Sequence, residues 1–311
     1  MKPLLSVVIA NYNYGRFLDE AIQSVIAQNM GDQVELIIVD GGSTDNSAEI
    51  IKKYANGLPP NISYTDWINS SNHNSQTPPL ITWWCSEKDG GQSAAFNKGF
   101  SHARGRFLTW LNADDVLLPE TIEKLKRAAE KSPEQEWFVG GCFWLNPAMK
   151  IVNMGRGRPF SEIRYREGNV SVWGPSSFFT KRLLESVHGV DERFHYMMDT
   201  DLWLRMAMTG ARYRPFCKYA WGLRLHPDAK MSGHNFDSDG NLNLRNRNAL
   251  NEKHKKAERQ KLQEVVWMNE YFKPRRTTIF TRLLSVNYYG ALAARAELLY
   301  YRGRYYKEYY K

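Results

Sequence analysis

The stretch WLNADDVLLP (residues 110–119) places one amide and two carboxylic acids inside an otherwise apolar run. The apolar residues that lead into it predict a buried strand with Asn112, Asp114 and Asp115 at its end. Burying an unpaired carboxylate costs several kcal/mol or forces the group to take up a proton. Asp114 and Asp115 therefore need a cation, a basic partner or open water.

Strands and helices alternate along the first half of the chain. Ser43 is expected to cap the second helix. Pro119 is expected to lie in the first turn of the helix TIEKLKRAAEK, which follows it in the sequence. Continuous apolar strands that alternate with helices predict an α/β fold, with a mostly parallel central sheet flanked by helices on both faces. The predicted strands are 4–10, 34–40, 81–87, 106–111 and 137–145, and the predicted helices are 17–28, 43–55, 90–103 and 121–131.

Polar or glycine-rich residues follow each of the first four strands. In parallel sheets, ligands bind beyond the carboxyl ends of the strands, so these residues are expected to line one edge. Tyr12 can stack on a base, and Asp40 can accept a hydrogen bond from a ribose or a base, although an aspartate there is equally typical of a cap or turn. Bound Mg²⁺ or Mn²⁺, held by one or two carboxylates and by phosphate oxygens, explains Asp114 and Asp115.

Several other classes of protein are disfavoured by the sequence. Neither GxGxxG nor GxxxxGK[ST] is present, which counts against a dinucleotide-binding domain and a phosphate loop. Cys85, Cys142 and Cys217 are far apart and in no CxxC spacing, which argues against a disulfide framework or a zinc site. The apolar run at 4–10 is too short for a membrane span and leads directly into polar residues. A cytoplasmic protein is expected.

The basic charge is concentrated in the C-terminal tail. Residues 251–311 carry fourteen Lys and Arg against six Glu, and they hold nine of the seventeen Tyr. One interpretation is a helical hairpin that packs on the catalytic domain with a solvated basic face. The other is a peripheral contact with an anionic membrane surface. The nearly neutral remainder of the chain gives no support to nucleic-acid binding.

Four motifs together resemble the family 2 glycosyltransferases with the GT-A fold. These motifs are SVVIANYN, VDGGSTDNS, EKDGGQSAAFNKG and WLNADD, and the resemblance extends from about residue 4 to about 232. It implies transfer of a sugar from a nucleotide diphosphate sugar, with a UDP-sugar as the expected donor, to an acceptor hydroxyl with inversion. The acceptor would be a saccharide or a lipid-linked saccharide in bacterial surface polysaccharide or glycolipid synthesis.

The resemblance also assigns donor-binding residues. The main chain of Ala10, together with Tyr12 and Asp40, would hold the nucleoside, and Gln92 would lie near the base or the diphosphate. Asn112-Ala113-Asp114 occupies the position of the family's DxD motif, with Asn in place of the first Asp. Asp114 would then bind the metal directly, and Asp115 would support it.

The second half of the chain is expected to supply the acceptor site and a general base. Asp199 precedes a helix and can be a simple N-cap, but MMDTDLWLR resembles the family's ED-containing segment with Met198 in place of Glu, which makes Asp199 the candidate base. Asp201 is expected to pair with Arg205.

The segment LRLHPDAKMS (223–232) resembles the one that closes the catalytic domain in relatives. The resemblance makes His226 a candidate metal ligand and makes Arg224 and Lys230 candidate phosphate partners. Trp173 and Ser176 fall where relatives bind the acceptor, although Trp173 is equally consistent with a core residue.

The predicted organisation is a catalytic domain followed by an extension. Residues 1–118 form the nucleotide-sugar and metal half, 119–235 the acceptor half, and 236–311 a basic, Tyr-rich helical extension. Two other functions remain open: a sugar-nucleotide-binding protein without catalysis, and a sugar nucleotidyltransferase. The latter normally has a Gly-rich basic loop after the first strand, which NYNYGRF matches poorly.

Overall fold

The computed structural model describes residues 2–62, 66, 80–166, 172–230, 235–236 and 242–243. The charged tail at 251–311 lies outside the described residues, as does the predicted helical extension apart from the short strands β12 (Asn235–Phe236) and β13 (Leu242–Asn243). Among the helices in the described ranges, none combines the length and the apolar character needed to cross a bilayer.

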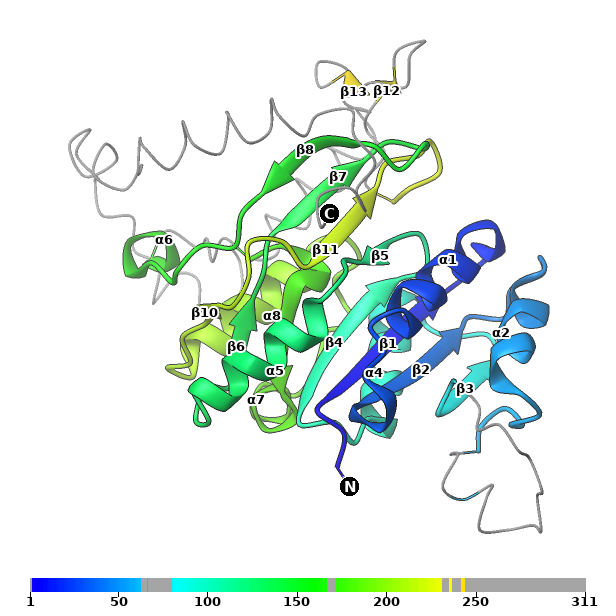
Figure 1. The fold of residues 1–311 in the computed structure, drawn as a ribbon, viewed down its shortest axis with the longest axis horizontal. Coiled ribbons are helices and arrows are strands. Elements are labelled where there is room, and N and C mark those ends of the chain that lie inside the picture. Colours follow the sequence, from blue (N-terminus) through cyan, green and yellow to red (C-terminus); the bar gives the residue numbers. More distant parts are fainter. Residues whose placement is uncertain are drawn as a thin grey trace.

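A seven-stranded sheet forms the centre of the fold (Figure 1). Its order is β10-β6-β9-β4-β1-β2-β3, and four of the six neighbouring pairs are parallel, which confirms the mostly parallel sheet. The strands are β1 (Leu5–Asn11), β2 (Val34–Asp40), β3 (Trp83–Ser86), β4 (Phe107–Asn112), β6 (Trp137–Val139), β9 (Ser177–Thr180) and β10 (Arg214–Pro215).

Helices cover both faces of this sheet, as predicted. Successive side chains of a strand point to opposite faces, so Val7 of β1 joins a core with the first set of helices and Val8 joins a core with the second. The first set is α1 (Gly15–Ile26), α2 (Ser47–Ala55) and α5 (Thr121–Lys131). The second set is α4 (Gln92–His102), α7 (Lys181–Ser186) and α8 (Met198–Met208).

A four-stranded sheet of order β5-β11-β7-β8 extends from the central one. It corrects the prediction of a single strand at 137–145, because the chain leaves the central sheet after β6 and enters the second sheet as β7. The break falls at Gly140-Gly141, where a Cβ on Gly141 would lie 2.1 Å from the Lys218 carbonyl oxygen. Its strands are β5 (Val116–Leu117), β7 (Cys142–Leu145), β8 (Ile151–Gly155) and β11 (Trp221–Arg224).

The predicted start of the second helix and the predicted place of Pro119 were wrong, whereas the helix at 121–131 was predicted correctly. Helix α2 begins at Ser47 with Asn46 at its N-cap, and Ser43 bonds to Asp40 instead of capping the helix. Helix α5 begins at Thr121, which leaves Pro119 outside the first turn. Strand β9 was not predicted, and it is antiparallel to both of its neighbours. The remaining short helices are η1 (Gly31–Gln33), α6 (Glu162–Arg166) and η2 (Gly174–Ser176).

Helix α4 packs closely against the sheet through Gly99. A Cβ at this position would lie 2.3 Å from Cγ1 of Val8 and 3.3 Å from Cγ2 of Val39. Both valines belong to central strands of the sheet and have little room to move. The close approach matters for function because the first turn of α4 carries Gln92 to the edge of the sheet.

We predict that Gly99→Ala destabilises the protein, by about 1–3 kcal/mol, because of this overpacking. Alanine has the higher helix propensity, so without the contact the change would be stabilising. Urea unfolding of Gly99→Ala and of Ser101→Ala, at an exposed site on the same helix, separates the two effects. Stabilisation by both substitutions would contradict the packing argument.

Candidate active site

The polar ends of the first four strands meet at one edge of the sheet. The register pairs Asn11 with Asp40, Asp40 with Ser86, and Ala10 with Asn112. The carboxyl ends of β1, β2, β3 and β4 therefore lie side by side, as the sequence predicts. This edge is the expected binding region of an open α/β sheet.

Asp40 is buried at the end of β2 and forms four hydrogen bonds within the protein. Its Oδ1 accepts from Asn11 Nδ2 at 2.6 Å and from Ser43 Oγ at 2.5 Å. Its Oδ2 accepts from the Ser43 amide at 3.0 Å and from Ser86 Oγ at 2.6 Å. These contacts give Asp40 the turn-forming role, and its contact with a nucleoside stays a prediction.

The other predicted nucleoside residues lie around Asp40 at the same edge. Tyr12 follows β1 and is 62% exposed, so its ring face is open to a ligand. Ala10 lies in β1 between β2 and β4, and is partly exposed. Gln92 is the first residue of α4 and donates to Asn112 Oδ1 at 2.8 Å. The structure thus brings Ala10, Tyr12 and Gln92 to one edge, and their binding roles stay predictions.

The turn after β4 holds one buried and one partly exposed carboxylate. Asp115 is 1% exposed and accepts from the Arg224 amide at 2.9 Å and from Asn112 Nδ2 at 2.7 Å. Burial, together with the negative charge of Asp114, raises the pKa of Asp115 well above its ordinary value. Asp115 therefore faces the interior and supports the turn, whereas Asp114 faces outward.

Asp114 lies beside His226, with 3.1 Å between Oδ2 and Nε2. His226 is buried, and its Nδ1 has no hydrogen-bond partner among the described residues. Within the described part of the chain, no three His, Cys, Asp or Glu side chains are grouped to hold a metal. The described residues can therefore offer a cation two ligands here, Asp114 and His226.

This pair fits a divalent cation that also binds phosphate oxygens. Two neighbouring ligands of an octahedral ion with bonds of about 2.1 Å are about 3 Å apart, which matches the separation of Asp114 Oδ2 and His226 Nε2. Mg²⁺ prefers oxygen ligands throughout, so an imidazole ligand would suit Mn²⁺ better than Mg²⁺. The remaining positions would be filled by a diphosphate and water.

Arg224 is placed differently from the prediction of a phosphate partner. It is buried, and its guanidinium donates to the Asp114 carbonyl oxygen at 2.9 Å and to Glu20 Oε2 at 2.5 Å. The guanidinium carbon lies 4.7 Å from the centre of the Phe17 ring. Arg224 therefore fastens the turn that carries Asp114 to helix α1.

Hydrogen bonds and an ion pair hold the segment after β11 in place. Tyr14 donates to the Asp228 carbonyl oxygen at 2.8 Å, and Arg16 forms an ion pair with the Asp228 carboxylate. Burial raises the pKa of Tyr14 to about 12, and the charges of Asp114 and Asp228 add to the rise. Lys230 donates to Gln92 Oε1 at 2.7 Å. These contacts hold the segment that carries His226 beside Asp114.

Asp199 lies in the first turn of α8, whose N-cap is Met197, so it is not the N-cap itself. Its Oδ1 accepts from the Thr200 amide at 2.6 Å. Burial raises the pKa of Asp199, and the bonds from Thr200 and the positive charge of Lys230 oppose that rise. A partly exposed carboxylate with a raised pKa is suited to accept a proton.

Helix α8 contacts the first turn of α4 through Met198, the residue before Asp199, and Sδ of Met198 lies 3.1 Å from Ser93 Oγ. Ser93 of α4 donates to the Phe194 carbonyl oxygen at 2.9 Å. The predicted pair of Asp201 and Arg205 is confirmed, with Arg205 Nε 2.8 Å from Asp201 Oδ2. Asp201 is buried and serves the structure of the helix.

The two predicted acceptor residues have different surroundings. Trp173 is 37% exposed and packs on β8, where a Cβ on Gly155 would lie 2.6 Å from its ring. Ser176 is fully buried, and its hydroxyl contacts the carbonyl oxygens of Gly140 and Trp173. Acceptor binding stays a prediction for both, and the burial of Ser176 favours a structural role for its hydroxyl.

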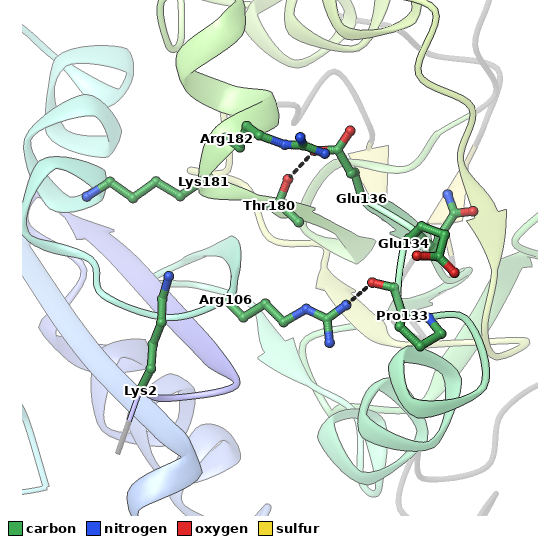
Figure 2. A pocket seen from close by; sticks show the side chains of 9 residues that line it. Lys2, Arg106, Pro133, Glu134, Glu136, Thr180, Lys181 and Arg182 are labelled. Carbon is green, nitrogen blue, oxygen red and sulfur yellow. Dashed lines mark hydrogen bonds and ion pairs between the residues drawn. The ribbon is translucent and has the colours of Figure 1, made fainter.

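A hollow of about 350 Å³ lies at the opposite, amino edge of the sheet (Figure 2). Its walls include Lys2, Arg106, Lys181 and Arg182, and Arg182 pairs with Glu136 at 2.8 Å. The predicted site residues do not line it. Its basic side chains are therefore separate from the strand ends that carry Asp40 and Asp114.

Sequence reasoning missed the residues that support the site. Asn11, Ser43 and Ser86 surround Asp40, and Glu20 and Tyr14 hold Arg224 and the segment after it. Asn11 and Tyr14 belong to the polar run NYNY, which starts with the last residue of β1 and was a usable signal. Glu20 carries no local signal, because its partner is 204 residues away.

Known proteins and a protein family are similar to parts of this chain. The family model of glycosyl transferase family 2 matches residues 6–140. An uncharacterized glycosyltransferase of Nostoc sp. is 36% identical over 128 residues, which are 41% of this chain and 33% of that protein. The minor teichoic acid biosynthesis protein GgaB of Bacillus subtilis is 33% identical over 121 residues, or 39% of this chain and 11% of that protein.

Among solved structures, TarS 1-349 of S. aureus in complex with UDP-GlcNAc has a similar fold. The TM-score is 0.51 at 17% identity, over 71% of this chain and 58% of that one. The chain thus spans less than two thirds of the length of each of these relatives. The fold is that of the GT-A glycosyltransferases. Residues 6–140, which carry the strand ends of the site, are thus similar to glycosyl transferase family 2.

Proposed function

We propose that this protein transfers a sugar from a nucleotide diphosphate sugar to an acceptor hydroxyl, with inversion and with a divalent cation. The observation that carries the proposal is the 3.1 Å approach of Asp114 Oδ2 to His226 Nε2 at the carboxyl edge of the sheet. When bound, Mn²⁺ would neutralise charge on the diphosphate as the sugar departs. Asp114 and His226 would hold the cation, and the residues described below would hold the donor and the acceptor.

The donor would lie along the ends of β1, β2 and β4. Exposed Tyr12 would stack on the base, and the turn that Asp40 organises would lie beside it. Lys230 presents its ammonium at the same edge, where it can meet the diphosphate. A UDP-sugar is the proposed donor, and the UDP-GlcNAc complex of the structural relative TarS supports this choice.

Asp199 would act as the general base on the acceptor side. An acceptor hydroxyl has a pKa far above neutrality, so a carboxylate that removes its proton during attack lowers the barrier. Attack from the side opposite the leaving diphosphate inverts the anomeric carbon. Lys230 lies near enough to Asp199 to oppose the rise in its pKa, which links the base to the donor side of the site.

The acceptor would be a saccharide or a lipid-linked saccharide of a bacterial surface polymer. The similarity to GgaB, a teichoic acid biosynthesis protein, supports this part of the proposal. Partly exposed Trp173 is the candidate platform for a sugar ring. Contact of residues 251–311 with an anionic membrane surface remains a separate proposal.

The two alternative functions are less well supported. A non-catalytic sugar-nucleotide-binding protein would not need Asp199 with a raised pKa beside the donor site. A nucleotidyltransferase is disfavoured by the match of residues 6–140 to glycosyl transferase family 2.

We predict that Asp114→Ala and His226→Ala each weaken Mn²⁺-dependent UDP binding by at least about 100-fold. Removal of a residue that only contacts a metal ligand already lowers metal affinity about 10–100-fold in many sites. Asp114 and His226 are the proposed direct ligands, so the loss should be at least as large. Isothermal titration with UDP, with and without Mn²⁺, measures the effect. The exposed Asp32→Asn serves as the matched control and should bind as the wild type does. Equal binding by all four proteins would refute the metal assignment.

We predict that Asp199→Asn lowers kcat by about 10³-fold, within the range expected for loss of a general base. Binding of UDP should change little, because the residue is on the acceptor side. Steady-state transfer assays with UDP-GlcNAc and a saccharide acceptor, combined with titration of UDP, test both expectations. A variant with unchanged kcat would rule out Asp199 as the base.

The pH profile of kcat provides an independent prediction. The base must be ionised, so activity is lost as the pH falls through the pKa of Asp199, which burial raises above its ordinary value of about 3.9. Lys230→Met removes a charge that lowers this pKa, so the acid limb should move to higher pH. Lys2→Met, at the distant hollow, should leave the limb in place. An acid limb that is the same in all three proteins would contradict the assignment.

A further inference from the structure

A chain of side-chain hydrogen bonds runs from Lys230 to the buried turn after β4. Lys230 Nζ donates to Gln92 Oε1 at 2.7 Å, Gln92 Nε2 donates to Asn112 Oδ1 at 2.8 Å, and Asn112 Nδ2 donates to Asp115 Oδ2 at 2.7 Å. The three bonds join the segment after β11, the first turn of α4 and the end of β4. They connect residues that are up to 138 positions apart in the sequence.

The direction of this chain is fixed by the ammonium at its end. A lysine ammonium can only donate, so the atom of Gln92 that faces it must be the amide oxygen. The amide nitrogen of Gln92 must then face Asn112 and leave the Asn112 nitrogen for Asp115. Asp115 consequently accepts on Oδ2 from Asn112, while Oδ1 accepts from the Arg224 amide at 2.9 Å.

From this geometry we infer that Asn112 is a positioning residue, and that a carboxylate in its place would weaken cation binding. The inference rests on the proposed binding of a cation and a diphosphate at Asp114. Asn112 stands at the first position of the DxD pattern, where an added carboxylate would ordinarily be expected to strengthen the metal site. In this protein, both ends of its amide are already engaged in bonds within the protein.

A carboxylate at position 112 would face the carboxylate of Asp115 at the distance of the present hydrogen bond, 2.7 Å. Asp115 is 1% exposed, so no water can enter to supply the donor that the two facing acceptor oxygens would lack. Arg224 cannot relieve them by moving, because it holds both the Asp114 carbonyl oxygen and Glu20. The turn would shift, and with it Asp114, whose orientation toward His226 the cation requires.

The exchange of the two residues supplies a sharp test. Asn112→Asp alone should weaken Mn²⁺-dependent UDP binding about tenfold or more and lower the Tm by roughly 5 °C. The double variant Asn112→Asp, Asp115→Asn restores every donor and acceptor match. The carboxylate at position 112 then accepts from Gln92 Nε2 and from the side-chain amide nitrogen at position 115. The side-chain oxygen at position 115 accepts from the Arg224 amide. The double variant should therefore recover binding to within about threefold of the wild type and recover most of the Tm.

Isothermal titration with UDP and Mn²⁺, together with thermal unfolding of the three proteins, gives both readouts. Binding by Asn112→Asp as tight as or tighter than that of the wild type would overturn the inference, as would an exchange variant no better than the single one. If Asn112→Asp fails to fold, recovery of UDP binding and of the Tm in the double variant would still support the inference, and no recovery would overturn it. If the wild type binds no Mn²⁺ and UDP, the proposed function fails, whereas the order of the three Tm values still tests the role of Asn112.

Discussion

The burial of Asp115 at the end of β4 is the constraint on which the rest of the site depends. A carboxylate at 1% exposure is tolerated only when both of its oxygens are matched by donors. The Arg224 amide and the Asn112 side chain provide them. The same residues then fix the turn, because Arg224 also binds the Asp114 carbonyl oxygen and Glu20 of α1. Asp114 is left partly exposed beside His226.

The two halves of the chain meet at this turn. Strands β1 to β4 present the donor side, whereas β11, the segment after it and α8 bring His226, Lys230 and Asp199. Lys230 bonds to Gln92 and lies near Asp199, so it connects the donor side with the proposed base. The proposed metal ligand and the proposed base lie on elements that are distant in sequence, and close packing of α4 through Gly99 and of α8 against Ser93 holds these elements together.

Much of the donor edge could be predicted from the sequence, because its signals are local. Continuous apolar runs located β1 to β4, and the rule that ligands bind beyond their carboxyl ends brought Tyr12, Asp40 and Asp114 together. The break at Gly140-Gly141 and the antiparallel β9 were missed, since short apolar runs do not reveal which sheet they join. Arg224 was misjudged because its partner Glu20 lies far away in the sequence.

The central claim is that Asp114 and His226 share a divalent cation at the edge of the sheet. Pulsed electron paramagnetic resonance of the protein with Mn²⁺ and UDP tests this directly, because a bound imidazole nitrogen modulates the electron spin echo. The account predicts such modulation in the wild type and its loss in His226→Gln. A protein that binds Mn²⁺ and UDP without any signal from a histidine nitrogen would contradict the account.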